Sequence, residues 1–194
     1  MKYLIVGLGN IGSEYSKTRH NVGFMVLDHL ASSIDSLFAT DRLGEVAKGR
    51  LKNKQLVLLK PNTYMNLSGK AVRYWMDKEN IPMDRLLVVT DDIAIGEGML
   101  RLKGKGSDGG HNGLKNINLL LNSRQYARLR FGVGNDFGKG NQVNYVLGEW
   151  SGEQLEQLQP NIQFASDCCK AFVLSGLQFA MNGFNKKVPP RPSA

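Results

Sequence analysis

Cysteine is scarce in this chain of 194 residues: there are two, Cys168 and Cys169, and they are adjacent. Two vicinal cysteines provide neither a disulfide framework nor a zinc site, since both need cysteines at wider spacings. No apolar run approaches the ~18–20 residues that a membrane-spanning helix requires. The segment before Gly7 has one lysine and a short apolar stretch, too little for a secretory signal. We therefore expect a cytoplasmic protein without membrane contact.

Several common catalytic motifs are also missing. The sequence has no HxxxH and no CxxC, and no serine has glycine at both −2 and +2. The first two absences argue against a zinc site, and the third against the nucleophile elbow of serine hydrolases. Both cysteines lie in a stretch that we predict to be buried helix, which disfavours a cysteine nucleophile. If the protein is a hydrolase, we expect water as the nucleophile and neither a metal nor a cofactor.

The charge is strongly unbalanced: 25 Lys and Arg against 17 Asp and Glu give a net charge of +8. Such a surplus is compatible with nucleic acid or a phosphorylated ligand, and equally with a merely soluble basic protein. The 42% hydrophobic and 22% charged residues are ordinary for a globular protein. Without a repeat or linker, the sequence predicts one domain over residues 1–184, a flexible basic tail over 185–194, and a monomer.

Hydrophobic periodicity predicts strands that alternate with helices. The expected strands are 2–6, 45–50, 55–59, 86–90, 99–102 and a half-exposed one at 127–133; the expected helices are 22–33, 68–78, 114–121 and 153–181. This order predicts an α/β fold with a twisted, mixed, mainly parallel sheet and helices on both faces. Such sheets bind ligands where strands end and loops lead into helices. The candidate loops are 7–21, 60–69, 91–98 and 104–113.

The segment Gly7–Gly12 reads GLGNIG and matches the dinucleotide fingerprint GxGxxG after a strand. In a true fingerprint the helix opens inside the motif, so that its N-terminus meets the pyrophosphate. Here the polar residues 13–21 separate the motif from the first apolar helical position. We therefore favour a glycine-rich turn that packs a loop close to the sheet. A nucleotide-dependent enzyme is one alternative.

Polar side chains gather in the candidate loops. His20 and His111 both lie in loops, and imidazole is the side chain best suited to exchange protons near neutral pH. Asp91 and Asp92 follow the strongest strand, where a carboxylate can orient an imidazole or cap a turn. Amide side chains in three of these loops could polarise a carbonyl, although each alone is typical of a turn; they are Asn10, Asn66 and Asn112.

Basic residues cluster around the glycine-dense loop 104–113. Alternation along strands predicts one shared face for Arg101, Lys103 and Lys105, and one for Arg128 and Arg130. The cluster favours a phosphate-binding surface beside the loops, and a solvated strand face is the alternative.

Four blocks of the sequence resemble the bacterial peptidyl-tRNA hydrolase family. They are IVGLGNIGSEYSKTRHNVG (5–23), KPNTYMNLSGKAV (60–72), VVTDDIAIGEG (88–98) and GSDGGHNGLKNI (106–117), followed by RLRFGVG (128–134). The similarity runs from Leu4 to about Gly176, and MNLSG together with GGHNGLK is its specific part. The resemblance implies an enzyme that cleaves the ester between a peptide and tRNA, and so recycles tRNA from prematurely released peptidyl-tRNA.

The resemblance also implies roles for individual residues. His20 would be the general base that activates water, Asp91 would hold its imidazole, and Asn10 would contact the peptide carbonyl and distinguish blocked from free aminoacyl-tRNA. Further contacts to the substrate would come from Tyr15, Tyr64, Asn66 and Asn112, and contacts to tRNA phosphates from Lys103, Lys105 and Arg130. The implied partner is peptidyl-tRNA.

The chain departs from the family pattern at three positions. Ile11 replaces the proline usual in GNPG, Ala94 stands where many members have a second aspartate, and Asp108 replaces a residue that is commonly Gly or His. None of these changes removes a residue of the implied catalytic set, so we expect activity. The alternative of another class is a non-catalytic RNA-binding relative that keeps only the basic surface.

Overall fold

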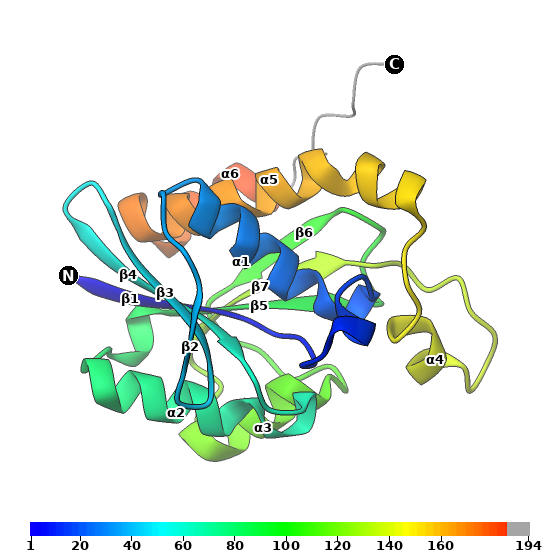
Figure 1. Cartoon of the computed structure of the whole chain (residues 1–194), viewed down its shortest axis with the longest axis horizontal. Coiled ribbons are helices and arrows are strands. Elements are labelled where there is room, and N and C mark those ends of the chain that lie inside the picture. Colours follow the sequence, from blue (N-terminus) through cyan, green and yellow to red (C-terminus); the bar gives the residue numbers. More distant parts are fainter. Residues whose placement is uncertain (186–194) are drawn as a thin grey trace.

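A seven-stranded sheet forms the centre of the structure, a computed structural model that describes residues 1–185 (Figure 1). The strands are β1 (Lys2–Gly7), β2 (Ala39–Asp41), β3 (Gly44–Leu51), β4 (Lys54–Pro61), β5 (Leu86–Asp92), β6 (Leu100–Lys103) and β7 (Ala127–Gly132), in the order β2-β3-β4-β1-β5-β7-β6. The four central strands are parallel, and the outer strands pair antiparallel. The predicted mixed, mainly parallel sheet is confirmed.

Helices cover both faces of this sheet, as predicted (Figure 1). One face carries α1 (Val22–Ser32), α5 (Gly152–Ser175) and α6 (Leu177–Phe184); the other carries α2 (Ser68–Glu79) and α3 (Asn112–Leu121), while the short α4 (Gln142–Val146) lies at one end. None of the helices in the described part of the chain combines the length and the apolar character needed to cross a membrane.

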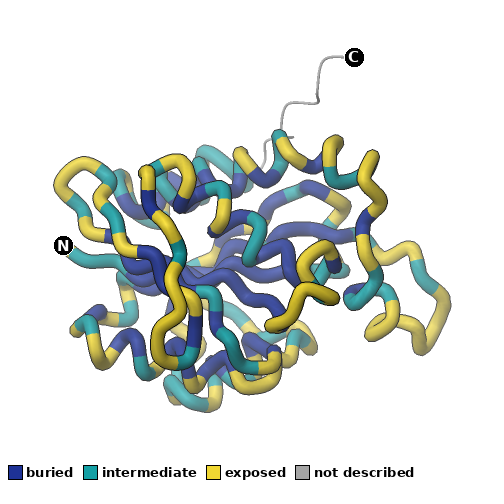
Figure 2. The backbone as a smooth tube through the Cα atoms, viewed as in Figure 1, coloured by how far each residue is buried: buried dark blue, intermediate teal, exposed yellow. Residues whose placement is uncertain are grey.

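The central strands are buried on both sides, which explains their continuous apolar sequences. Leu4, Ile5 and Val6 of β1 are all fully buried. Side chains of β1 alternate between two apolar cores, Ile5 packing under α1 and α5 and Leu4 under α2. Figure 2 shows the buried strands between two layers whose outer surfaces are exposed.

The glycines of the GLGNIG segment allow a loop to pack closely on α1. A Cβ atom at Gly23 would lie 2.5 Å from the backbone nitrogen of Leu8, and one at Gly7 would collide with the Gly23 carbonyl. Helix α1 begins at Val22, well beyond the motif, so the helix N-terminus that a dinucleotide needs is not at GLGNIG. The structure therefore supports the close-packed turn over the nucleotide-binding alternative.

The strand predicted at 127–133 is present as β7, but the prediction that it is half-exposed is wrong. Arg128 of β7 is fully buried, and its guanidinium donates to the backbone oxygens of Ser107 and Arg124, both at 3.0 Å. The guanidinium also stacks on the Tyr126 ring, 4.2 Å from its centroid. An Arg–Leu alternation suggests exposure, but a long cationic side chain is tolerated inside when carbonyl oxygens accept its protons.

Other boundaries also differ from the prediction. The helix expected over 153–181 is divided at Gly176, whose φ of 87° ends α5 before α6 begins. The three-residue β2 and the five-residue α4 were not predicted, because such short elements show no periodicity. Asn185, which we expected in the tail, exchanges two hydrogen bonds with the Leu102 backbone of the edge strand β6. The rest of the predicted tail, 186–194, lies outside the described residues.

Candidate active site

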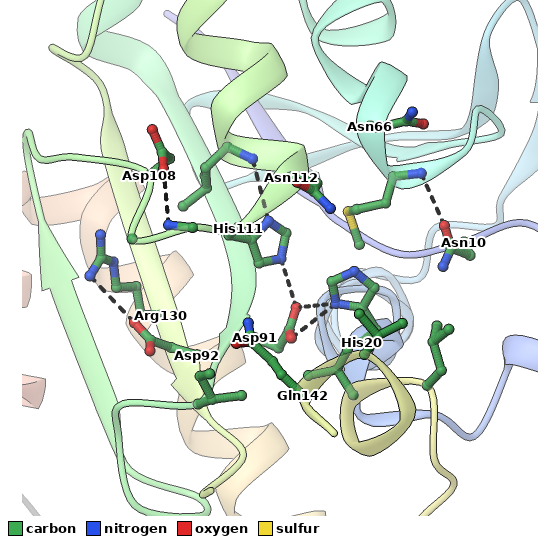
Figure 3. Close-up of a pocket in the computed structure, with 18 of the residues that line it drawn as sticks. Asn10, His20, Asn66, Asp91, Asp92, Asp108, His111, Asn112, Arg130 and Gln142 are labelled. Atoms are coloured by element: carbon green, nitrogen blue, oxygen red, sulfur yellow. Dashed lines mark hydrogen bonds and ion pairs between the residues drawn. The ribbon is translucent and has the colours of Figure 1, made fainter. Parts of the chain in front are cut away.

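A cleft of about 480 Å³ opens at the carboxyl ends of the parallel strands (Figure 3). Ligand sites in proteins commonly have ~300–1,000 Å³, so this volume suits a small molecule or part of a larger one. Its walls come from the loops after β1, β4 and β5, from the loop before α3, and from α4. The first four are the candidate loops of the sequence analysis, and α4 is an addition that only the fold reveals.

His20 and Asp91 face each other in this cleft. His20 lies in the short turn before α1, and Asp91 lies at the end of β5. Nδ1 of His20 is 2.9 Å and 3.0 Å from the two carboxylate oxygens of Asp91 (Figure 3). Because an ionised carboxylate only accepts, Nδ1 carries the proton and donates it. The lone pair is then on Nε2, which has no hydrogen-bond partner among residues 1–185.

A second imidazole approaches Asp91 from the other side. Nε2 of His111 lies 2.8 Å from Oδ1 of Asp91 and 2.7 Å from the hydroxyl of Thr90. Nδ1 of the same ring accepts from the backbone N–H groups of Gly113 and Leu114, at 3.1 Å and 3.3 Å, and so caps α3. His111 therefore joins the N-terminus of α3 to the carboxylate that holds His20.

Asp91 is a buried carboxylate, with 3% of its side chain exposed. Burial by itself raises the pKa of Asp91, but the adjoining His111 and His20 rings outweigh burial and hold that pKa well below its usual range. Asp91 is consequently ionised at neutral pH, and is able to stabilise positive charge on His20.

Three asparagines and one tyrosine of the predicted set also line the cleft. Asn10 is almost buried, and its Oδ1 accepts from the backbone N–H of Met65 at 3.0 Å, which fixes the amide. The loop that carries Asn10 is held in turn by Asn21, whose side chain bonds both the N–H and the carbonyl of Asn10. Asn66, Asn112 and Tyr64 are exposed at the rim.

Arg130 lies at the other end of the cleft from Asn10 (Figure 3). One guanidinium nitrogen is 3.3 Å from Oδ2 of Asp92, and the other donates to the Ser107 carbonyl at 2.8 Å. These two contacts orient the guanidinium beside the cleft.

The structure does not bring every predicted residue into the lining. Lys103 is exposed on β6 and Lys105 in the following loop, both outside the cleft. Tyr15 is partly buried in the turn Ser13–Tyr15 and also lies outside the lining.

Two of the departures from the family pattern take part in turn geometry. The backbone N–H of Ala94 donates to Asp92 at 2.8 Å, and Asp108 accepts from the backbone N–H of Gly110 at 2.9 Å. Asp108 therefore shapes the loop before α3. Ile11 is 47% exposed, so its side chain has no role in the core.

His20, Asp91 and His111 are also the residue types that bind metals, and their nearest side-chain atoms lie within 4.8 Å of one another. Each of these facing atoms takes part in an N–H···O hydrogen bond, so shared protons account for the arrangement. The expectation that the reaction needs no metal stays a prediction.

Sequence reasoning noted His111 as a loop histidine but did not include it in the site. The signal was its place shortly before the predicted helix 114–121, since a side-chain acceptor just ahead of a helix can cap it. Gln142, Val143 and Val146 of α4 were missed altogether, because a five-residue helix has no detectable pattern.

The fold and the cleft together define a single-domain α/β protein with a histidine–carboxylate pair in a polar cleft. The family model for peptidyl-tRNA hydrolase matches residues 4–191. Peptidyl-tRNA hydrolases of Parabacteroides distasonis and Bacteroides fragilis are 57% and 54% identical to this chain over 187 residues, which are 96% of this chain and 100% of each relative. The crystal structure of peptidyl-tRNA hydrolase from Acinetobacter baumannii matches with a TM-score of 0.90 and 34% identity, over 97% of this chain and 96% of that one.

The chain therefore belongs to the peptidyl-tRNA hydrolase family. The predicted family and the predicted class of enzyme, a hydrolase, are confirmed.

Proposed function

We propose that this chain hydrolyses the ester bond between a peptide and tRNA, with water activated by His20 as the nucleophile. The observation that carries the proposal is the His20–Asp91 pair: the Nδ1 proton is committed to a buried carboxylate, and Nε2 keeps its lone pair. A base positioned in this way typically contributes ~10²–10⁴-fold to a rate. An ester has an activated leaving group, so one base and a few hydrogen-bond donors are sufficient.

The reaction then takes place in two steps. Water gives a proton to Nε2 of His20 while its oxygen bonds to the ester carbonyl carbon, and the carbonyl electron pair moves onto oxygen. The tetrahedral oxyanion then collapses, the bond to the ribose oxygen of the terminal nucleotide breaks, and that oxygen takes the proton from His20. Asp91 stabilises the imidazolium between the two steps. The products are a tRNA with a free hydroxyl group and a peptide with a free carboxylic acid, which releases its remaining proton to solvent as a carboxylate.

The asparagines supply neutral donors to the substrate. Because Oδ1 of Asn10 is occupied by the Met65 N–H, its Nδ2 is the group available for a substrate carbonyl, and we propose the peptide carbonyl next to the ester. The amides of Asn66 and Asn112, at the rim of the same cleft, would position the ester and stabilise the oxyanion. One such donor is typically worth ~10²–10³-fold in kcat.

Basic side chains beside the cleft suit the phosphates of tRNA. Arg101 pairs with Arg130 in the β6–β7 register, and residues paired in this way share one face. The exposed Arg101 and Lys103 therefore lie on the same face as Arg130, and Lys105 follows in the loop. We propose that this face binds the tRNA backbone, that Tyr64 contacts the terminal nucleotide, and that Tyr15 contributes from outside the cleft.

Such a reaction would return tRNA to translation after premature release of peptidyl-tRNA from the ribosome. Because its substrate arises during translation, we place the activity in the cytoplasm. We propose a monomer as the active form.

A release assay with N-acetyl-aminoacyl-tRNA tests the proposal. We expect wild-type protein to release the blocked amino acid, and His20→Ala to abolish turnover while its Kd for tRNA stays within about threefold. Equal release by both proteins would exclude His20 as the base. Binding of tRNA without any release by the wild type would favour the non-catalytic RNA-binding alternative.

A further inference from the structure

His111 is a histidine whose protons can be assigned from its neighbours. The N–H groups of Gly113 and Leu114 can only donate, so Nδ1 of His111 must be the unprotonated acceptor. The ring proton is then on Nε2, which faces both Asp91 and Thr90. Both nitrogens are therefore engaged, and the ring has no lone pair to offer a substrate. His111 is not a second base.

The His111 ring is one of two hydrogen-bond donors to the carboxylate of Asp91. Within residues 1–185, the donors to its carboxylate are Nδ1 of His20 and Nε2 of His111, and no lysine or arginine forms an ion pair with it. The nearby Arg130 pairs with Asp92 instead. A buried carboxylate that loses one of two donors has an oxygen without a hydrogen bond. The side chain then rotates toward another donor or takes up a proton. Either change weakens its hold on the proton of His20.

The same ring also fixes the start of α3. Its Nδ1 caps the helix whose first residue, Asn112, lines the cleft. The His20 and His111 rings lie 5.0 Å apart between centroids, inclined at 44°. The His111 side chain thus contacts both the Asp91 carboxylate, which holds His20, and the backbone at the start of α3, which carries Asn112.

We infer that His111 is a positioning residue for the proposed hydrolysis: as the Nε2–H tautomer it donates to Asp91 and keeps that carboxylate oriented toward Nδ1 of His20. The inference rests on the proposed function, and it adds a second imidazole to the pair that the sequence singled out. The hydrogen bond to Asp91 does not touch the substrate, so its loss acts on kcat more than on KM.

Two substitutions separate the two contacts of the ring. In His111→Gln the amide nitrogen stands near the place of Nε2 and continues to donate to Asp91, while the acceptor that caps α3 is lost. In His111→Asn the shorter side chain keeps an acceptor for the cap, while the donor to Asp91 is lost. His29→Asn, on α1 and outside the lining of the cleft, is the matched control.

We expect His111→Asn to lower kcat about ten- to a hundredfold with little change in KM, because a hydrogen bond to a buried charge is lost. His111→Gln should retain most of kcat but melt at a lower temperature, since it lacks the cap. His29→Asn should match the wild type in kcat. Equal kcat losses in both His111 variants, in proportion to their loss of folded protein, would show a merely structural role and overturn the inference.

A double-mutant cycle tests whether His111 acts through Asp91. In an Asp91→Asn background, His111→Asn should lower kcat no further, because the carboxylate that it positions is gone. Additive effects would refute a role through Asp91.

Nitrogen-15 NMR of histidine-labelled wild-type protein tests the assigned protons without any activity measurement. The expected spectrum has the proton of His111 on Nε2 and that of His20 on Nδ1. The opposite tautomer for His111 would overturn the inference even if peptidyl-tRNA is hydrolysed. The expected tautomer in a protein without release activity would leave the positioning geometry intact and refute the proposed function instead.

Discussion

Replacing Asp91 by asparagine removes a charge and leaves the shape of the side chain almost unchanged. The two Asp91 oxygens lie 2.9 Å and 3.0 Å from Nδ1 of His20, so the imidazolium formed in the reaction has its counter-charge in direct contact. Two opposite charges at ~4 Å attract by about 4 kcal/mol at an effective dielectric constant of ~20. That energy corresponds to a fall of about 10³-fold in kcat.

The assay is single-turnover release of N-acetyl-aminoacyl groups from tRNA, stopped by acid, with Kd for tRNA measured separately. Asp92→Asn is the matched control, since Asp92 contacts Arg130 and the Ala94 N–H and makes no contact with the imidazoles. We expect Asp92→Asn to keep kcat within about threefold of the wild type while KM rises through Arg130.

The reasoning is refuted if Asp91→Asn releases the acyl group as fast as Asp92→Asn at saturating tRNA. A comparable loss in both variants, together with a lower melting temperature in both, would instead attribute the effect to packing at the end of β5.

Three further predictions concern the loop packing, the basic face and acid stability. Gly23→Ala should lower the free energy of unfolding by ~1–3 kcal/mol in urea titrations, because its Cβ meets the Leu8 backbone at 2.5 Å. Arg130→Glu should raise KM and flatten its dependence on salt concentration, since one phosphate contact is lost. The pKa of Asp91 is lower in the folded than in the unfolded chain, so ionised Asp91 stabilises the fold above about pH 4, and this contribution is lost as the pH falls below that value. Urea titrations between about pH 4 and pH 2 should therefore show a smaller loss of stability for Asp91→Asn than for the wild type.

Each of these has a control on the same scaffold. Gly152→Ala, where a Cβ meets no atom within 4 Å, should leave the free energy of unfolding nearly unchanged. Arg73→Glu, an exposed position on α2, should leave the salt dependence of KM as it is. If the free energy of unfolding falls equally with pH in the wild type and in Asp91→Asn, the pKa of Asp91 is not lowered by folding.

Much of the site could be predicted from the local pattern of apolar and polar residues in the sequence. The apolar runs of β1 and β5 predict buried parallel strands, and such strands direct their carboxyl ends toward one edge of the sheet. His20 and Asp91 follow from this rule, since each lies in a loop or strand end at that edge. Polar residues clustered there were sufficient to select the loops of the cleft.

Other features could not be predicted from the local sequence pattern. Arg128 reads as an exposed strand residue, because the carbonyls that accept its protons come from Ser107 and Arg124 in the folded chain. The three-residue β2 and the short α4 depend on packing against other elements, since neither is long enough to be stable by itself.

The sequence by itself determined the order of strands and helices, the glycines of the close-packed turn, and the residue types available for proton transfer, because these depend on near neighbours in the chain. Only the tertiary structure decided which ring nitrogen carries the proton in each imidazole. His20 and Asp91 are 71 residues apart, and His111 and Asp91 are 20 apart. Whether a ring nitrogen donates or accepts is set by the group that it meets in the folded chain. Packing of two loops against the end of β5 brings a nitrogen of His20 to 2.9 Å and one of His111 to 2.8 Å from Oδ1 of Asp91.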